Sequence, residues 1–318
     1  MSWLKRLWFF RRKREAAPED EEEAVKPTRP LAPQETQPVS PQEVSETPKA
    51  WAVYPPQIRV GVAQSAGRLR PNNEDALFTW TFASAGSHQA FWGGLFIVAD
   101  GMGGHSHGEL ASQHAVYTFA RALMQSFFLP WLEDWQQPPP EALPTLESAL
   151  EKANRMVQAI ALGGGTTLTA ALLWGERLVL IHVGDSRAYY LSPQGTFELL
   201  TMDHTVVARL VTQGDLTEEE AAYHPHRNML YQALGQREPL NPDIHTRTFP
   251  PGSVLLLCSD GLWDELPESR IADILKAHRG DPIQAAHILV SEAEQAGGHD
   301  NITAVVIQRV PSYTSVLA

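Results

Sequence analysis

The chain has 318 residues, 43% of them apolar, which is ample for a packed core and predicts a folded globular protein. Its formal net charge of −12 lies in residues 57–318, where 28 Asp and Glu outnumber 16 Lys and Arg, and this acidic body argues against nucleic acid as a partner. The single cysteine, Cys258, excludes an intramolecular disulfide and a cysteine cluster for zinc, so a reducing, cytoplasmic compartment is expected.

The first 14 residues mix six aromatic or aliphatic side chains with six basic ones. The apolar stretch is too short for a secretory signal, and no small-residue cleavage site follows it. No stretch of the chain approaches the roughly 20 apolar residues that a transmembrane helix needs. Two interpretations stay open for residues 1–14: a peripheral anchor on the anionic inner face of the membrane, or a terminus without order of its own.

Residues 15–56 are predicted to form a disordered linker. They hold nine prolines and an acidic run at residues 19–23, and their few isolated apolar residues cannot offset the entropy lost on ordering. The chain from residue 57 to residue 310 then reads as one folded domain, followed by a short tail at residues 311–318.

Within the folded domain the apolar patterns predict nine strands and five helices. The strands are expected at residues 58–63, 76–82, 91–99, 166–174, 177–183, 187–191, 243–248, 253–259 and 302–308. The helices are expected at residues 108–126, 141–161, 205–213, 267–278 and 282–296, with Asp281 as the N-cap of the last. Because strands come mostly in consecutive pairs with helices grouped between them, antiparallel sheets are favoured over a doubly wound parallel sheet.

Residues 201–237 stand apart, since they show little strand pattern between two clear strands. They contain Asp203-His204, an acidic trio at residues 218–220 and the run His224-Pro225-His226-Arg227. An insertion of this length is typical of a functional lid or a mobile loop.

Four aspartates each lie where an apolar strand meets a turn that contains glycine or asparagine. Asp100, Asp185 and Asp260 follow predicted strands, and Asp300 precedes the last one. If these strands share one core, their ends gather the four carboxylates, which would repel one another strongly unless divalent cations neutralised them. The pattern therefore predicts a metal site.

Two further motifs suit a metal-dependent phosphate ester site. In the run from Asp100 to His105, glycines let a backbone carbonyl approach an ion, although a plain strand-to-helix turn would also need them. Arg70 precedes the acidic pair Glu74-Asp75; arginine binds phosphate with a planar fork, and acids can orient metal-bound water. In isolation this second motif is most simply a solvated turn, but local explanations do not account for the coincidence of all the motifs.

The order and spacing of these motifs resemble the metal-dependent Ser/Thr protein phosphatases of the protein phosphatase 2C (PP2C, or PPM) family in its bacterial form. The resemblance covers about residues 58–309. It rests on Gly67 to Asp75, Asp100 to His105 with Gly108-Glu109, Gly165 to Ala170, Gly184 to Arg187, Asp203-His204, Ser259 to Gly261 with Asp264, and Gly298 to Asn301.

The resemblance implies an α+β fold, a four-layer α-β-β-α sandwich with two central antiparallel sheets and metals in a cleft at one edge. Asp100 would bridge two Mn²⁺ or Mg²⁺ ions, with the Gly101 carbonyl on one ion and Asp260 and Asp300 on the other.

Further roles follow from the same resemblance. Glu74 and Asp75 would act mainly through metal-bound waters, and Arg70 would bind the phosphate. Asp185 and Asp264, with Asp260, would form a third, more weakly held metal site, and residues 205–237 would form a flap near the substrate groove.

The implied activity is hydrolysis of phosphoserine and phosphothreonine in proteins, with a water that bridges the two cations as the nucleophile. The expected partners are phosphoproteins, including a bacterial Ser/Thr kinase that the enzyme opposes. One departure concerns the leaving oxygen: eukaryotic members carry a histidine, proposed as general acid, where this chain has Met102, as many bacterial relatives do. The proton for the leaving oxygen must then come from a metal-bound water or from another residue. His105 is near in sequence, but a structural role in the turn is the simpler interpretation of this histidine.

Two alternative functions belong to other classes. A catalytically weak relative could serve as a phosphoprotein-binding regulatory module, which loss of a metal aspartate would favour, yet Asp100, Asp260 and Asp300 are all present. A metal-dependent esterase for small phosphates or nucleic acid is opposed by the acidic body and by the absence of a basic, aromatic groove in the sequence.

Overall fold

The computed structural model describes residues 57–310 except 86–89, 104–105, 162 and 237–238. The predicted anchor (1–14), linker (15–56) and tail (311–318), together with His105, lie outside the described residues. The strands are β1 (Ile58–Ser65), β2 (Ala76–Ala85), β3 (Ala90–Ala99), β4 (Gly101–Met102), β5 (Gly165–Thr166), β6 (Leu168–Trp174), β7 (Arg177–Val183), β8 (Arg187–Leu191), β9 (Phe197–Leu199), β10 (Asp243–Thr248), β11 (Val254–Cys258) and β12 (Ile302–Arg309). The helices are α1 (Ser106–Leu123), the π-helical turn η1 (Met124–Phe128), α2 (Leu129–Glu133), α3 (Ala142–Ile160), α4 (Val206–Gln213), α5 (Glu218–Ala222), α6 (Asp260–Trp263), α7 (Glu268–Ala277) and α8 (Pro282–Ala296).

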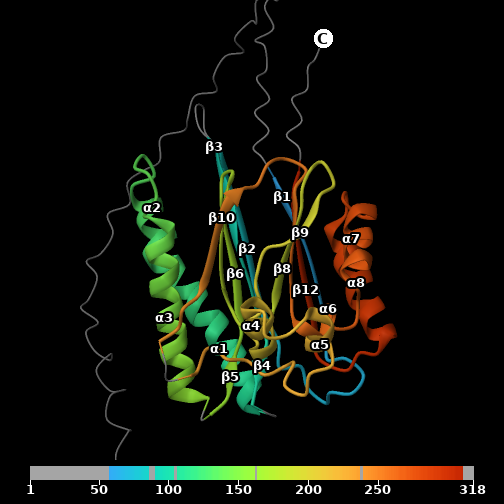
Figure 1. Ribbon diagram of the computed structural model, residues 1–318. Helices are drawn as coiled ribbons and strands as arrows, with labels where there is room; N and C mark the ends of the chain where they lie inside the picture. Colours follow the sequence, from blue (N-terminus) through green and yellow to red (C-terminus); the bar gives the residue numbers. More distant parts are fainter. Residues whose placement is uncertain (1–56, 86–89, 104–105, 162, 237–238, 311–318) are drawn as a thin grey trace, which may run out of the picture. The chain divides into compact units, whose positions relative to one another are not determined.

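Two five-stranded sheets lie face to face in the middle of the folded domain (Figure 1). One has the strand order β1-β12-β11-β8-β9 and the other has the order β10-β7-β6-β3-β2. Every pair of neighbouring strands is antiparallel, as the consecutive strand pairs in the sequence predicted. Helices α1 and α3 cover the outer face of the second sheet, and α7 and α8 cover the outer face of the first (Figure 1). The predicted four-layer α-β-β-α sandwich is confirmed.

The central strands are apolar on both faces because each face has its own partner. In β3, Leu95 and Ile97 pack against the helical layer of α1 and α3, whereas Phe96 and Val98 pack between the two sheets. This alternation is the two-residue period of a strand, and burial on both sides explains why β3 reads as a continuous apolar run in the sequence. Strands β11 and β12 divide their side chains in the same way, with one set toward α7 and α8 and the other toward the second sheet.

A glycine sets how closely α8 can approach β1. A Cβ atom on Gly61 would lie 1.8 Å from the backbone carbonyl oxygen of Pro282, the first residue of α8. Asp281 caps this helix by accepting a hydrogen bond from Gln284 N at 3.0 Å, as predicted. The close approach fixes α8 against the sheet and thereby places the turn that follows it, which carries Asp300.

The predicted helices and long strands are found within a few residues of their expected limits, whereas short elements were missed. Strands β4 and β9 and helices α2, α5 and α6 have no more than five residues each, too few for a periodic pattern to show. For α5 the sequence did carry a signal: Thr217 and Glu220 form a capping box, in which each side chain bonds the other residue's backbone N–H.

The part of the chain that the structure describes contains no helix with the combined length and apolarity of a bilayer span.

Candidate metal centre

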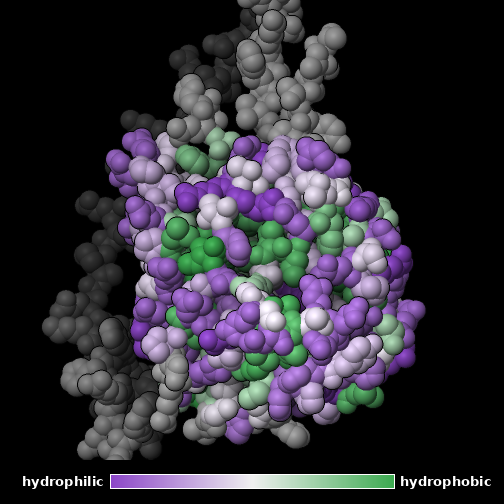
Figure 2. Space-filling model, viewed as in Figure 1, coloured by the Kyte–Doolittle hydropathy of each residue, from purple (hydrophilic) through white to green (hydrophobic). Residues whose placement is uncertain are grey.

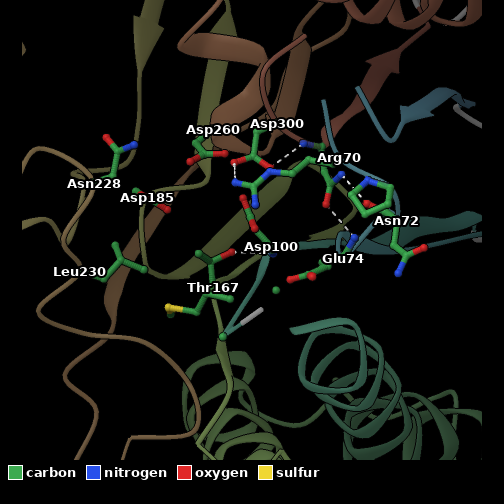
Figure 3. A pocket seen from close by; sticks show the side chains of 15 residues that line it. Arg70, Asn72, Glu74, Asp100, Thr167, Asp185, Asn228, Leu230, Asp260 and Asp300 are labelled. Carbon is green, nitrogen blue, oxygen red and sulfur yellow. Dashed lines mark hydrogen bonds and ion pairs between the residues drawn. The ribbon is translucent and has the colours of Figure 1, made fainter. Parts of the chain in front are cut away.

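One end of the sandwich gathers four aspartates that are far apart in the sequence. Asp100 follows β3, Asp185 follows β7, Asp260 follows β11, and Asp300 lies two residues before β12. Figure 3 shows the Asp100, Asp260 and Asp300 side chains pointing toward a common centre. The antiparallel order produces this gathering, because β3, β7 and β11 all end at the edge where β12 begins.

These carboxylates line a pocket of about 340 Å³ at that edge. Arg70, Glu74, Gly101 and Met102 also line it, and residues 228 and 230 reach it from the opposite side (Figure 3). The predicted site residues therefore lie together, with two exceptions. Asp75 is not among the residues that line the pocket, and Asp264 lines an adjoining groove.

Backbone contacts fix Asp100 at the centre of the pocket. Its N–H donates to Thr167 Oγ1 at 2.8 Å, and its carbonyl accepts from Thr167 N at 2.9 Å and from Thr166 Oγ1 at 2.8 Å. The next residue must be glycine, since a Cβ on Gly101 would lie 2.2 Å from the carbonyl oxygen of Gly108. Thr166 and Thr167 thus hold the backbone of Asp100 in place.

Glu74 reaches the pocket through a second close approach. A Cβ on Gly108, in the first turn of α1, would lie 2.2 Å from Glu74 Oε2, so only glycine leaves room for this carboxylate. Figure 3 shows the Glu74 side chain directed toward Asp100.

Burial keeps these acids from ionising easily. Desolvation, followed by the charge of Asp260, raises the pKa of Asp100 well above its usual value. Desolvation also raises the pKa of Asp260 to about 6 and that of Asp75 to about 7. For Asp185 the pKa is likewise raised, first by burial and then by the charge of Asp260. The cluster therefore carries more carboxylates than it can hold as anions without a counterion.

The donors fit Mn²⁺ or Mg²⁺. Asp260 Oδ1 and Asp75 Oδ1 are buried and have no hydrogen-bond partner among the described residues, so each is a free acceptor. The acidic side chains that line the pocket offer oxygen, the ligand atom of hard cations. Within the described ranges, no three acidic, His or Cys side chains already converge as ligands of a single ion. Because Mg²⁺ keeps several waters and binds through one or two carboxylates, sharing of carboxylates between hydrated ions suits this arrangement.

Asp75 is held by two hydroxyl groups. Its Oδ2 atom accepts hydrogen bonds from Ser259 Oγ at 2.7 Å and from Thr303 Oγ1 at 2.6 Å. These bonds tie the loop before β2 to the ends of β11 and β12, next to Asp260.

Arg70 lies at the mouth of the pocket. Its Nη2 atom donates to Asp300 Oδ2 at 2.6 Å, and this bond raises the pKa of the guanidinium. The Arg70 side chain is 54% exposed, so the planar fork can turn toward a ligand in the pocket.

Asn301 fastens the loop that carries Arg70 and Glu74, a role that the sequence did not reveal. Its Oδ1 atom accepts from Glu74 N at 2.7 Å, and its Nδ2 group donates to the carbonyls of Ala66 and Asn72 at 3.0 and 2.9 Å. The side chain is buried, and all three bonds join segments more than 220 residues apart. An asparagine next to an aspartate carries no local signal for such a contact.

Of the residues predicted to hold a third metal, Asp185 and Asp260 line the pocket, and Asp264 lines the groove beside it. Asp264 follows α6, and burial raises its pKa. Trp263 Nε1 donates to the Asp185 carbonyl at 3.0 Å, and the Trp263 ring packs under the Arg187 guanidinium at 3.7 Å. Arg187 in turn holds Asp203 with two bonds, at 3.0 and 2.8 Å, where the flap begins.

A partly buried aspartate cluster with one arginine, at the edge of an α-β-β-α sandwich, is the arrangement expected of a metal-dependent phosphate ester site. The family model described as protein phosphatase 2C matches residues 70–284. The chain belongs to the protein phosphatase 2C family.

Among its relatives is the serine/threonine phosphatase stp of Listeria welshimeri, which is 35% identical over 250 residues, 76% of this chain and 92% of that protein. The crystal structure of the Mycobacterium tuberculosis serine/threonine phosphatase PstP/Ppp is 35% identical, with a TM-score of 0.66, and the match covers 80% of this chain and 99% of that one. The catalytic domain of PstP in complex with two manganese ions is similar at a TM-score of 0.64, with 35% identity and the same coverage.

Proposed function

We propose that the chain is a metal-dependent protein phosphatase that hydrolyses phosphoserine and phosphothreonine with Mn²⁺ or Mg²⁺. The observation that carries this function is the convergence of Asp100, Asp260 and Asp300 around a pocket with Arg70 at its mouth. Membership of the protein phosphatase 2C family and the two manganese ions of the PstP catalytic domain support it.

The residue roles are assigned on the same grounds. Asp100, the Gly101 carbonyl, Asp260 and Asp300 would hold the two core ions, because these residues line one pocket. Glu74 and Asp75 are assigned to water around the ions. Asp185 and Asp264 are assigned, with Asp260, to a third ion.

When bound, the cations would acidify water and neutralise the charge of the phosphoryl group. The remaining chemistry belongs to the chain. Asp300 bonded to a cation would release Arg70, whose fork can then bind two phosphoryl oxygens and hold phosphorus in line with the attacking water. Met102 lines the pocket where a general acid would be useful and cannot donate a proton, so protonation of the leaving oxygen falls to water.

Metal removal tests this function. Purified protein should hydrolyse a phosphothreonine peptide and p-nitrophenyl phosphate with Mn²⁺, lose both activities in EDTA, and regain them when excess Mn²⁺ is added back. The physical reason is that the clustered carboxylates alone would repel a phosphate dianion. Full turnover in EDTA would rule out the assignment.

Two finer assignments are also proposals: that the phosphoprotein substrates include a bacterial Ser/Thr kinase, and that residues 1–14 hold the protein on the inner face of the membrane. Release of phosphate from an autophosphorylated kinase of the same cell tests the first.

The paired aromatic and basic side chains of residues 1–14 support the proposed membrane contact. Deleting residues 1–14 should move the protein out of the membrane fraction, and an unchanged distribution would refute the anchor.

A further inference from the structure

A groove of about 1200 Å³ opens directly from the metal pocket. The two cavities share Arg70, Asn228, Asp260 and Asp300, so they are continuous. The pocket alone, at about 340 Å³, is at the small end of the range for ligand pockets, whereas the groove exceeds the upper end of that range, roughly 1000 Å³. The groove is therefore large enough to hold the chain on one side of a phosphorylated residue that enters the pocket.

Part of the groove lining is an apolar strip. Val207, Ala208 and Val211 contribute to it from one face of α4, and Trp263 contributes from α6. Met202, 49% exposed, continues this strip toward the start of the flap. Figure 2 shows apolar and hydrophilic side chains side by side on the face that carries α4 and α6.

The rim of the groove has an excess of negative charge. Arg187 forms ion pairs with two carboxylates, Asp203 at 2.8 Å and Glu268 at 3.6 Å. One positive charge faces two negative charges, so this group has a net charge of about −1. Glu265 accepts hydrogen bonds from His299, a residue that is charged only when protonated. Glu218, exposed in the first turn of α5, forms no ion pair with any described residue.

The cations in the groove do not cancel this excess. Outside the pocket it holds two arginines, Arg187 and Arg227, and the charge of Arg227 acts on Asp264, where it opposes the rise in that carboxyl's pKa from burial. An apolar strip bordered by carboxylates suits arginine and lysine above other side chains, because their aliphatic stems lie on apolar surface while the charged ends reach the rim.

We propose that this groove selects phosphoprotein segments that carry arginine or lysine within about three residues of the phosphorylated residue, and that Glu218 and Glu268 recognise the cation. The proposal rests on the phosphatase function above and adds a substrate preference to it. Charged rims of this kind act mainly by favouring encounter with the matching partner and disfavouring the opposite charge.

Phosphothreonine peptides of one length test it, with Arg, Ala or Glu placed three residues before or three residues after the phosphothreonine. On at least one side of the phosphothreonine, we expect kcat/KM to be highest for the Arg peptide, lower for the Ala peptide and lowest for the Glu peptide. The span, which is the ratio of kcat/KM between the Arg and Glu peptides, should be about tenfold and should shrink at high salt. Glu218→Gln should reduce that span about threefold, and Glu218→Gln with Glu268→Gln should nearly remove it.

Glu219→Gln is the matched control, since Glu219 occupies the same helical turn and does not line the groove. It should leave the span unchanged. Equal rates for the three peptides on both sides, or equal effects of Glu218→Gln and Glu219→Gln, would overturn the proposal. Turnover of p-nitrophenyl phosphate, which needs only the pocket, distinguishes failure of the substrate preference from failure of the phosphatase function. If this turnover persists while the peptides show no preference, only the substrate preference is refuted. If this turnover is absent with Mn²⁺, the phosphatase function is refuted as well.

Discussion

We expect the Asp260→Asn variant to lose at least about 100-fold in kcat/KM on both a phosphothreonine peptide and p-nitrophenyl phosphate. Asp260 lines both the pocket and the groove and has a buried oxygen without a partner among the described residues. We assign it to one of the two core ions and to the third ion. Asparagine keeps the shape of the side chain but removes the negative charge that would hold the cations.

The loss should not come from unfolding. In metal-stripped protein at pH 8, the free energy of unfolding of Asp260→Asn should equal or exceed that of the parent, because the variant no longer buries this charge. Mn²⁺ should raise the melting temperature of the parent more than that of the variant, since only a bound cation stabilises the folded state. Asp273→Asn, at an exposed position on α7, is the control and should keep full activity. Activity of Asp260→Asn within a few-fold of the parent would refute the assigned role.

The second large effect concerns the stability of metal-stripped protein and Asp75. Its pKa in the folded state is raised from 3.8 to about 7, mainly by burial. Between these values the folded state holds a proton that the unfolded state has lost, so raising the pH lowers the free energy of unfolding. At 1.36 kcal/mol per pKa unit, the loss is on the order of 4 kcal/mol across the interval. The Asp75→Asn variant has no carboxyl group to ionise there, so its stability relative to the parent should rise by about this amount between pH 4 and pH 8.

Only the difference between the two proteins is diagnostic, because His182 has the opposite dependence. Burial, followed by the charge of His204, lowers the pKa of His182 to about 3, so this histidine destabilises the fold as the pH falls below about 6.5. That contribution is common to parent and variant and cancels. Urea unfolding of both metal-stripped proteins across the pH range gives the difference. A difference that stays constant, or that falls with pH, would contradict the burial of an ionisable Asp75.

The sequence predicted most of the secondary structure because that information is local, whereas the four-layer sandwich was implied by the resemblance to the protein phosphatase 2C family. The strand β7 was predicted with its observed limits, Arg177–Val183, and so was the helix α8 with its Asp281 cap. Strand and helix patterns, helix caps and glycine turns involve residues that are close together in the chain. They can therefore be recognised from the sequence. The positions of Asp100, Asp185, Asp260 and Asp300 at strand ends followed from the same local patterns.

Tertiary structure alone decided which side chains meet across the sandwich. Asp75 is bonded to Ser259 and Thr303, Asn301 fastens the loop of Glu74, and Glu218 borders a groove shared with Trp263. Each of these arrangements joins segments more than 40 residues apart, and most join segments about 200 residues apart. Such arrangements depend on strand register and on how closely glycines let the backbones approach. The raised pKa values have the same origin, since burial is a property of the assembled layers. The sequence by itself thus determined the kind of site and its main acids, and the packing determined their protonation, their supports and the surface that a substrate meets.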